Sequence, residues 1–571
     1  MVSFISRAAL AAIVLTLPSI GAAQSASGAY LAGRQALYSS DFDAAATYYT
    51  RALTSDRNNP ELMENVILSQ LALGRLDAAL PLAQMMRTQG LSSQVAHMVM
   101  ATHMIAEGDF QALLDRDVET LGIGLLVDGL ITAWSWLGVG DLERALLAFD
   151  DVAEQNGLST FAHYHKALAL ASIGQYAEAE AIFAEDEGGL SRMSRRGAIA
   201  RAQILSQLDR NEDALALLDD AFGGAPLDPG LAAIADRLAA GENVPFDQVG
   251  TVRDGLAEVF FSISSALQGE ASDDFALIYT RTAIHLRPDH IDALLLAGDL
   301  LEGLGQYDLA VSTYRKVPPD SPDYHAAEMG RAEALRRAAK PDAAIEVLTR
   351  LADDYPTLPQ VHSALGDLQR QQENYGAAAD AYDRAIEFTE DGAPSQWHLH
   401  YARGISHERL KDWDRAERDF RKALELNPEQ PQVLNYLGYS LVERREKLDE
   451  ALDMIERAVA ARPDSGYIVD SLGWVLYRLG RYAEAVAHME HAVELMPVDP
   501  VVNDHLGDVF WAVGRYREAE FQWKRAVSFI DPEDTDGEAD PVRIRRKLEV
   551  GLDKVLAEEG APPLKVANDG G

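Results

Sequence analysis

The sequence predicts an all-α protein built as a solenoid of stacked helix-turn-helix repeats. Three segments between residues 431 and 531 carry the same order of small and large residues. Their Leu-Gly pairs begin at Leu437, Leu472 and Leu506, so successive pairs are 35 and 34 residues apart. A fixed period of this length is typical of helical repeat arrays. The composition agrees, because 47% of the 571 residues are apolar and so long a chain exceeds one ordinary core.

Residues 1–23 are expected to form a secretory signal peptide. Arg7 precedes an apolar run from Ala8 to Leu17, and Gly21-Ala22-Ala23 supplies the small residues that signal peptidase accepts. The run is too short to span a bilayer comfortably, and no other segment is expected to be a transmembrane span. We expect cleavage and a periplasmic location; an uncleaved anchor or an ordinary first helix is the alternative. The chain has no cysteine, so neither disulfides nor an N-terminal lipid anchor are expected.

Residues 24–228 carry the repeat more faintly, as a divergent N-terminal block. Units begin near Ala26, Pro60, Gln94, Leu126, Thr160 and Arg195. The unit from Gln94 is poor, because Leu113 replaces a small residue and the second helix looks short. Residues 229–256 fit no unit and are expected to be an irregular linker or hinge. The alternative is one degenerate repeat inside a continuous solenoid.

Residues 257–533 form the regular C-terminal block. Units begin near Ala257, Ile291, His325, Pro359, Trp397, Pro431, Gly466 and Pro500. Small residues recur where the two helices of a unit cross, because a larger side chain would push them apart. An acidic loop is expected at 534–540, a capping helix at 541–559 and a flexible tail at 560–571. This division gives about fourteen repeats, with the capping helix covering the open face of the last one.

The charge and the motifs argue against several classes of function. A formal net charge of −39 repels nucleic acid and anionic lipid head groups, so we expect neither as a partner. His407-Glu408 begins like a zinc-protease motif, but Lys411 stands where the second histidine must lie. No Gly-Lys pair exists for a phosphate-binding loop. We therefore predict no catalytic residue, no cofactor and no metal site. An enzyme with an unrecognised site is the alternative, and residues 94–125 or 229–256 would hold it.

The repeat resembles the tetratricopeptide repeat (TPR). The phrases from Leu437 to Leu441 and from Asp470 to Gly480 are similar to those of large secreted TPR proteins of Gram-negative bacteria. One related group consists of outer-membrane lipoproteins that bind a processing protease and present substrates to it. This chain departs from that group because it lacks the lipid-bearing cysteine. The resemblance implies a right-handed superhelix whose first helices line a concave side, where peptides or helices bind.

One strip of side chains on the first helices is the predicted protein-binding surface. Asp470, Trp474 and Tyr477 share a helical face, being four and three residues apart. Together with the matching positions of the flanking units, the predicted strip consists of Asn435, Tyr439, Asp470, Trp474, Tyr477, Asp504, Asp508 and Trp511. The alternative is that these aromatic side chains pack between adjacent first helices. The acidic residues of the strip favour basic or neutral peptides over carboxylate-bearing ones.

These inferences together predict a non-catalytic scaffold or adaptor in the bacterial cell envelope. Its partners would be proteins or peptides, including a periplasmic protease and its substrates. The second hypothesis is a component of an envelope machine that assembles or exports polysaccharide or outer-membrane proteins.

Overall fold

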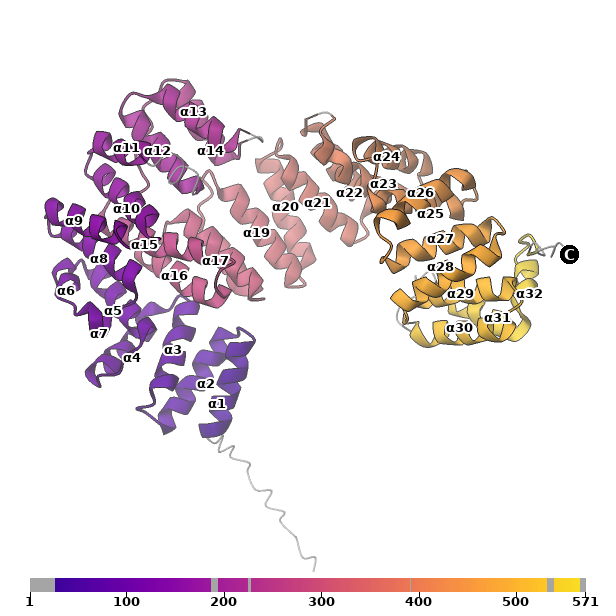
Figure 1. Ribbon diagram of the computed structural model, residues 1–571, viewed down its shortest axis with the longest axis horizontal. Helices are drawn as coiled ribbons and strands as arrows, with labels where there is room; N and C mark the ends of the chain where they lie inside the picture. The colour runs from indigo at the N-terminus through magenta and orange to yellow at the C-terminus, as the bar shows by residue number, and fades with distance from the viewer. Residues whose placement is uncertain (1–25, 186–193, 224–226, 391, 531–538, 565–571) are drawn as a thin grey trace, which may run out of the picture. The chain divides into compact units, whose positions relative to one another are not determined.

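The computed structural model describes residues 26–185, 194–223, 227–390, 392–530 and 539–564. Within these ranges every regular element is helical (Figure 1), which confirms the all-α prediction. The chain divides into two compact units, the first ending at Val347 and the second beginning at Leu348. The expected signal peptide, residues 534–538 of the acidic loop and residues 565–571 of the tail lie outside the described residues.

Unit 1 contains α1 to α19 and the first part of α20. Their bounds are α1 (Ala26–Tyr38), α2 (Phe42–Ser55), α3 (Pro60–Ala72), α4 (Leu76–Thr88), α5 (Gln94–Glu107), α6 (Phe110–Leu114), α7 (Val118–Leu121), α8 (Leu125–Gly138), α9 (Leu142–Ala153), α10 (Ser159–Ser172), α11 (Tyr176–Glu185), α12 (Arg195–Gln207), α13 (Asn211–Phe222), α14 (Pro229–Ala239), α15 (Val252–Leu267), α16 (Asp273–Leu286), α17 (Ile291–Gly303), α18 (Tyr307–Tyr314), α19 (Tyr324–Arg337) and α20 (Pro341–Asp354).

Unit 2 contains the rest of α20 and the helices that follow it. They are α21 (Pro359–Gln371), α22 (Tyr375–Glu387), the 3-10 helix η1 (Pro394–Gln396), α23 (Trp397–Arg409), α24 (Trp413–Leu426), α25 (Pro431–Glu443), α26 (Leu448–Ala461), α27 (Gly466–Arg478), α28 (Tyr482–Leu495), α29 (Pro500–Ala512), α30 (Tyr516–Phe529), α31 (Pro541–Val550) and α32 (Leu552–Glu558).

Helix pairs in both units pack through the small residues that the sequence singled out. Gly298 of α17 lies against the ring of Tyr314, and Gly366 of α21 lies against the ring of Tyr382. Both tyrosine side chains are fully buried. The turns between the paired helices often hold a left-handed residue, such as Gly480 with φ of 80°, because the chain must reverse within two or three residues. Close crossing and a tight turn together give the helix-turn-helix unit.

In unit 1, α15 and α16 lie beside helices that are far away in the sequence (Figure 1). α15 contacts α5, α8 and α10, and α16 contacts α3 and α5. Trp134 of α8 is fully buried against Gly255 of α15, where any side chain would collide with the indole ring. Arg281 of α16 donates a hydrogen bond to the carbonyl oxygen of Ala72 at 3.1 Å. The first helices α3, α5, α8 and α10 therefore have the chain's own α15 and α16 packed on them.

The segment 229–256 is only partly irregular. Asp228 accepts a hydrogen bond from the Leu231 backbone at 2.9 Å, and Pro229 occupies the first turn, so α14 begins there. Residues 240–251 form no helix, but the Val244 N–H donates to Ser206 Oγ at 2.9 Å. Because α14 occupies residues 229–239 and α15 begins at Val252, the irregular linker or hinge predicted for residues 229–256 is reduced to residues 240–251. Asp228, a typical helix-capping residue, and Pro229, which is favoured in the first turn, indicated this helix in the sequence.

The expected capping helix at 541–559 is two helices, α31 and α32, that meet at Gly551. The φ of Gly551 is 84°, a value that continues no right-handed helix. A side chain there would also meet the indole ring of Trp511, 2.5 Å away. The bend places both short helices against the last repeat. Across the described ranges, no helix is both long and apolar enough to cross a bilayer.

Candidate functional site

The predicted strip lies on α25, α27 and α29, the first helices of three successive repeats in unit 2, and α23 is the first helix of the repeat before them. α25 contacts α27, and α27 contacts α29. A cavity of about 600 Å³ opens among these helices and the start of α24. Its lining includes Glu408, Trp413, Asn435, Tyr436, Tyr439, Tyr467, Asp470, Met496 and Val501. A volume of this size, with aromatic walls and a few polar groups, is typical of a ligand-binding pocket.

Two polar atoms on the cavity lining have no hydrogen-bond partner among the residues that the structure describes. The amide oxygen of Asn435 and the indole Nε1 of Trp413 are both buried and unpaired. The whole Asn435 residue is only 8% exposed. Because buried polar groups are nearly always paired, a free acceptor and a free donor on one cavity wall indicate groups that a ligand can satisfy. The main chain of a peptide offers both a matching N–H and a matching C=O.

Other polar groups of the cavity already have partners. Glu408 accepts hydrogen bonds from the Tyr436 hydroxyl at 2.6 Å and from Ser440 Oγ at 3.1 Å. Burial and the neighbouring Glu408 carboxylate raise the pKa of Tyr436, so its hydroxyl stays protonated and keeps donating. These bonds fix the orientation of the Tyr436 ring. In contrast, Tyr467 is 49% exposed and presents its ring at the cavity.

Trp474 and Tyr477 lie inside the contact between α27 and α29 rather than in the open cavity. Trp474 stacks on His505 with ring centroids 3.9 Å apart, and on Tyr477 with centroids 4.8 Å apart. Its indole N–H donates to Glu443 at 2.7 Å. His505 also bonds Asp470 through Nδ1 at 3.0 Å. Trp474 and Tyr477 are 7% and 8% exposed. Their positions agree with the alternative that these aromatic side chains pack between adjacent first helices.

Asp504, Asp508 and Trp511 are covered by the C-terminal helices α31 and α32. Lys547 of α31 places its Nζ 2.8 Å from Asp504 and 2.6 Å from Asp508. The Trp511 indole N–H donates to Asp553 of α32 at 3.0 Å. Burial is the main cause of the raised pKa of Asp504, which Lys547 partly opposes. These three residues therefore hold the cap in place.

The structure thus separates the eight predicted residues into two groups. Asn435, Tyr439 and Asp470 line the open cavity. The other five lie in contacts between helices, and a binding role for them stays a prediction. Trp413, at the start of the second helix α24, and Tyr467, at the start of the first helix α27, were not among the predicted residues. An aromatic residue at a helix start was the available signal, but the predicted strip contains only residues from the second turn of the first helices onward.

In the described part of the chain, no group of three or more histidine, aspartate or glutamate side chains is arranged so that it could hold a metal ion. His407 instead approaches Asp419 at 3.9 Å, and Asp419 is engaged by Arg403 at 2.6 Å. This ion cluster holds α23 against α24.

Comparison with known families identifies the repeats. A model described as a tetratricopeptide repeat matches residues 30–90, 132–189, 329–394, 401–466 and 441–500. A second tetratricopeptide repeat model matches residues 292–320, and the matches together cover more than half of the chain. The chain belongs to the tetratricopeptide repeat family. TPR proteins generally mediate interactions between proteins, and the TPR fold is typically a non-catalytic scaffold.

Individual TPR relatives match only parts of the chain. The TPR repeat-containing protein PA4667 of Pseudomonas aeruginosa is 28% identical over 179 residues, which are 31% of this chain and 29% of that protein. A lipoprotein NlpI homolog of Haemophilus influenzae is 40% identical over 87 residues, 15% of this chain and 26% of that protein. The chain therefore spans less than a third of either relative. The crystal structure of the APC/C hetero-tetramer Cut9-Hcn1 gives a TM-score of 0.37 at 13% identity, covering 92% of this chain and 96% of that one.

Proposed function

We propose that this TPR protein is a non-catalytic adaptor that binds a segment of a partner protein in the cavity among α23, α25, α27 and α29. The observation that carries the proposal is the unpaired amide oxygen of Asn435, buried on the wall of a cavity of about 600 Å³. A peptide N–H can pair with it, and the Tyr467 ring offers a large contact area at low entropy cost. Membership of a family of interaction scaffolds supports this reading.

The cavity favours a partner segment with an apolar centre and charges of both signs. Arg409, Lys411 and Arg444 line it together with the carboxylates Glu408 and Glu443. Basic or neutral peptides were expected because the predicted strip is acidic. Asp504 now pairs with Lys547, and Asp470 with His505, so those carboxylates no longer favour a basic ligand. The charges of both signs on the cavity lining therefore determine where the charged residues of the segment lie. They do not select a segment of positive or negative net charge.

The proposed setting is the bacterial cell envelope. The signal-like N-terminus supports export, and the similarity to a lipoprotein of Haemophilus influenzae supports an envelope role. Within that setting, the adaptor would present substrates to a periplasmic protease. The second candidate function is that of a component of a machine that assembles or exports polysaccharide or outer-membrane proteins. A cavity that binds protein segments suits this role as well as the presentation of substrates to a protease.

Affinity capture from a cross-linked periplasmic extract tests the adaptor function. The full chain is compared with Asn435→Leu, which removes the unpaired acceptor, and with Tyr467→Ala, which removes the exposed ring. Phe521→Ala is the matched control, because Phe521 is 60% exposed on α30 and does not line the cavity. We expect both cavity variants, but not the control, to lose the same captured proteins.

The identity of the captured proteins separates the two candidates. A protease with its substrates supports the presenting role, whereas assembly or export components support the second candidate. Full recovery of every captured protein by both cavity variants, with unchanged melting curves, would contradict binding in this cavity.

A further inference from the structure

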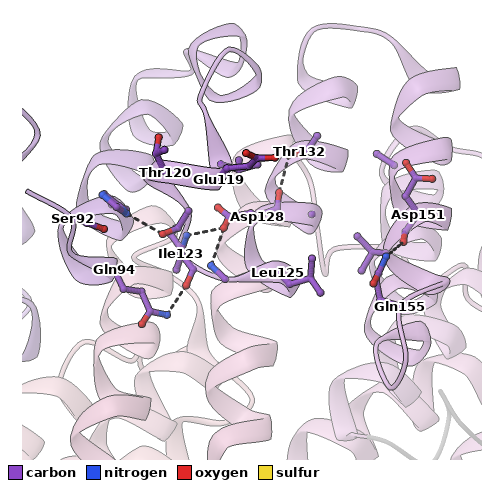
Figure 2. A pocket seen from close by; sticks show the side chains of 17 residues that line it. Ser92, Gln94, Glu119, Thr120, Ile123, Leu125, Asp128, Thr132, Asp151 and Gln155 are labelled. Carbon is purple, nitrogen blue, oxygen red and sulfur yellow. Dashed lines mark hydrogen bonds between the residues drawn. The ribbon is translucent and has the colours of Figure 1, made fainter. Parts of the chain in front are cut away.

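Unit 1 holds a second cavity, of about 750 Å³, between α5 and α7 on one side and α8 and α9 on the other. In Figure 2, Gln94 and Ile123 lie on one side of this space, and Asp151 and Gln155 lie on the other. The cavity exists because the repeat is incomplete. Its second helix is broken into α6 of 5 residues and α7 of 4, whereas α9 of the next repeat has 12. The shortened helix leaves volume that a regular repeat fills.

The wall of this cavity is held by a network of buried hydrogen bonds. The Asp128 carboxylate accepts hydrogen bonds from the backbone N–H groups of Ile123 and Gly124, at 2.7 and 2.8 Å, and from Arg116 at 2.6 Å. The Gln94 side chain donates to the Ile123 carbonyl oxygen at 2.5 Å. The dashed lines in Figure 2 trace the bonds among Gln94, Ile123 and Asp128. The loop between α7 and α8 is thereby fixed, so the cavity is formed before any ligand arrives.

Apolar groups and carboxylates line the cavity together. Ile123 and Val152 are buried on its walls, while Leu125 is 68% exposed and Val118 is 43% exposed. Glu119 and Asp151 are exposed carboxylates on the lining and form no ion pair within the described part of the chain. None of the lining residues is lysine or arginine. The site therefore combines an apolar surface with uncompensated negative charge.

His97 adds an unused hydrogen-bond acceptor to the same lining. Its Nδ1 lies 3.0 Å from the Gly122 carbonyl oxygen, and a carbonyl only accepts, so Nδ1 carries the proton. When the imidazole is neutral, Nε2 is then an acceptor, and it is buried with no partner in the described part of the chain. The His97 residue is only 6% exposed. A buried acceptor of this kind is rarely left unpaired, and the N–H of a bound peptide can satisfy it.

We propose that this cavity is a second binding site, for a peptide segment of a partner protein that inserts an aliphatic side chain flanked by lysine or arginine. The aliphatic group would be buried against Ile123 and Val152, where removal of apolar area from water favours binding. The flanking cations would lie beside Glu119 and Asp151. This site is separate from the cavity of unit 2, so a chain with both sites can hold two different segments.

Titration of the full chain with three short peptides tests the proposal. The probes are acetylated and amidated Gly-Ser-Lys-Leu-Leu-Lys-Ser-Gly, the same peptide with both lysines replaced by glutamate, and the same peptide with both leucines replaced by glycine. Methyl NMR signals of Ile123, Leu125 and Val152 report occupancy. We expect saturable shifts with the first peptide only, because the second is repelled and the third lacks the aliphatic side chains.

Two variants connect binding to the cavity itself. Ala148→Leu places a larger side chain on the lining and is expected to abolish the shifts. The double variant Glu119→Gln with Asp151→Asn is expected to weaken binding about three- to tenfold, because two exposed charges are lost. The matched control, Glu143→Gln with Glu154→Gln, removes two exposed charges that do not line the cavity, one in the first turn of α9 and one just after its last residue, and should change affinity less than about twofold.

Equal binding of the lysine and glutamate peptides would overturn the proposal, as would an absence of shifts with the lysine peptide at millimolar concentration. Unchanged binding to the folded Ala148→Leu variant would also overturn it, because the peptide would then lie outside the cavity.

Discussion

Lys547 is a fully buried charged residue whose burial depends on its partners. Its side chain is fully buried, with Nζ at 2.8 Å from Asp504 and 2.6 Å from Asp508. The Trp523 indole N–H also donates to Asp508 at 2.9 Å. A charge in such a place is tolerated only because opposite charges surround it. The cluster makes α31 a specific cap for the last repeat rather than a loosely held tail.

We predict that Lys547→Met destabilises the cap by about 3–5 kcal/mol, because Asp504 and Asp508 lose the cation that they share. Among the described residues, Asp508 then keeps only the Arg543 cation, at 3.7 Å. Hydrogen exchange of the α29 and α31 amides measures the effect and should show much faster opening. Lys554→Met is the matched control, because Lys554 is exposed on α32. Equal protection in the two variants would mean that the buried ion cluster does not hold the cap.

His165 gives unit 1 a defined response to pH. Burial lowers its pKa to about 4, while its neighbours Trp134 and Ser262 bond the two ring nitrogens. The pKa of a histidine in the unfolded chain is about 6.5, so the unfolded state takes up the proton first as the pH falls. The stabilising contribution of neutral His165 is therefore complete above pH 6.5 and is lost as the pH falls toward 4.

We predict that lowering the pH from 7 to 5 costs unit 1 about 2 kcal/mol through His165, at about 1.36 kcal/mol per pH unit below its unfolded pKa. Hydrogen exchange of α10 at the two pH values, corrected for the intrinsic exchange rate, measures it. His165→Gln should remove this part of the pH dependence, whereas His163→Gln, on the same helix but partly exposed, should retain it. A pH dependence that survives in His165→Gln would assign the response to other groups.

At the scale of helices, the packing of each repeat depends on glycines that admit an aromatic ring. A Cβ at Gly366 would lie 2.7 Å from the Tyr382 ring, inside any real contact distance. A Cβ at Gly376 of the adjacent helix α22 would meet nothing within 4 Å. The two glycines therefore have opposite roles, although both lie within helices of one repeat.

We predict that Gly366→Ala destabilises unit 2 by about 1–3 kcal/mol, because the fully buried Tyr382 cannot move aside without displacing its neighbours. Gly376→Ala should be neutral or stabilise by up to about 1 kcal/mol, because alanine favours helix. Thermal unfolding of the two full-length variants compares them directly. A melting temperature for Gly366→Ala at or above that of Gly376→Ala would contradict this packing account.

The repeat architecture followed from the sequence because its signals are local. Leu-Gly pairs, small crossing residues and helix caps each depend on neighbours within one unit. The contacts that the sequence did not predict join distant segments. Nothing near Arg281 or Gly255 indicates that α15 and α16 pack on α3, α5, α8 and α10. The residues of the strip do lie on first helices. However, Lys547 and His505 pair with acidic residues of the strip from other helices, and the repeat period does not predict such contacts.

At the scale of the whole molecule, the net charge of −39 limits the surfaces that the chain can approach. We predict no binding to vesicles rich in anionic lipid at physiological salt, because repulsion between like charges outweighs any local attraction. Vesicle flotation measures this, with neutral vesicles as the control. Retention on anionic but not on neutral vesicles would show a local basic surface that the overall charge conceals.

The central claim is that a partner segment binds in the cavity among α23, α25, α27 and α29. Site-specific photo-crosslinking tests it most directly, with a photoreactive phenylalanine analogue placed at Tyr467 in the cavity or at Phe521 on α30. Both positions are well exposed, at 49% and 60%. The account predicts a specific protein adduct at position 467 that is absent at position 521 and is lost when Asn435→Leu is added. Equal adducts at the two positions, or an adduct at 521 alone, would contradict it.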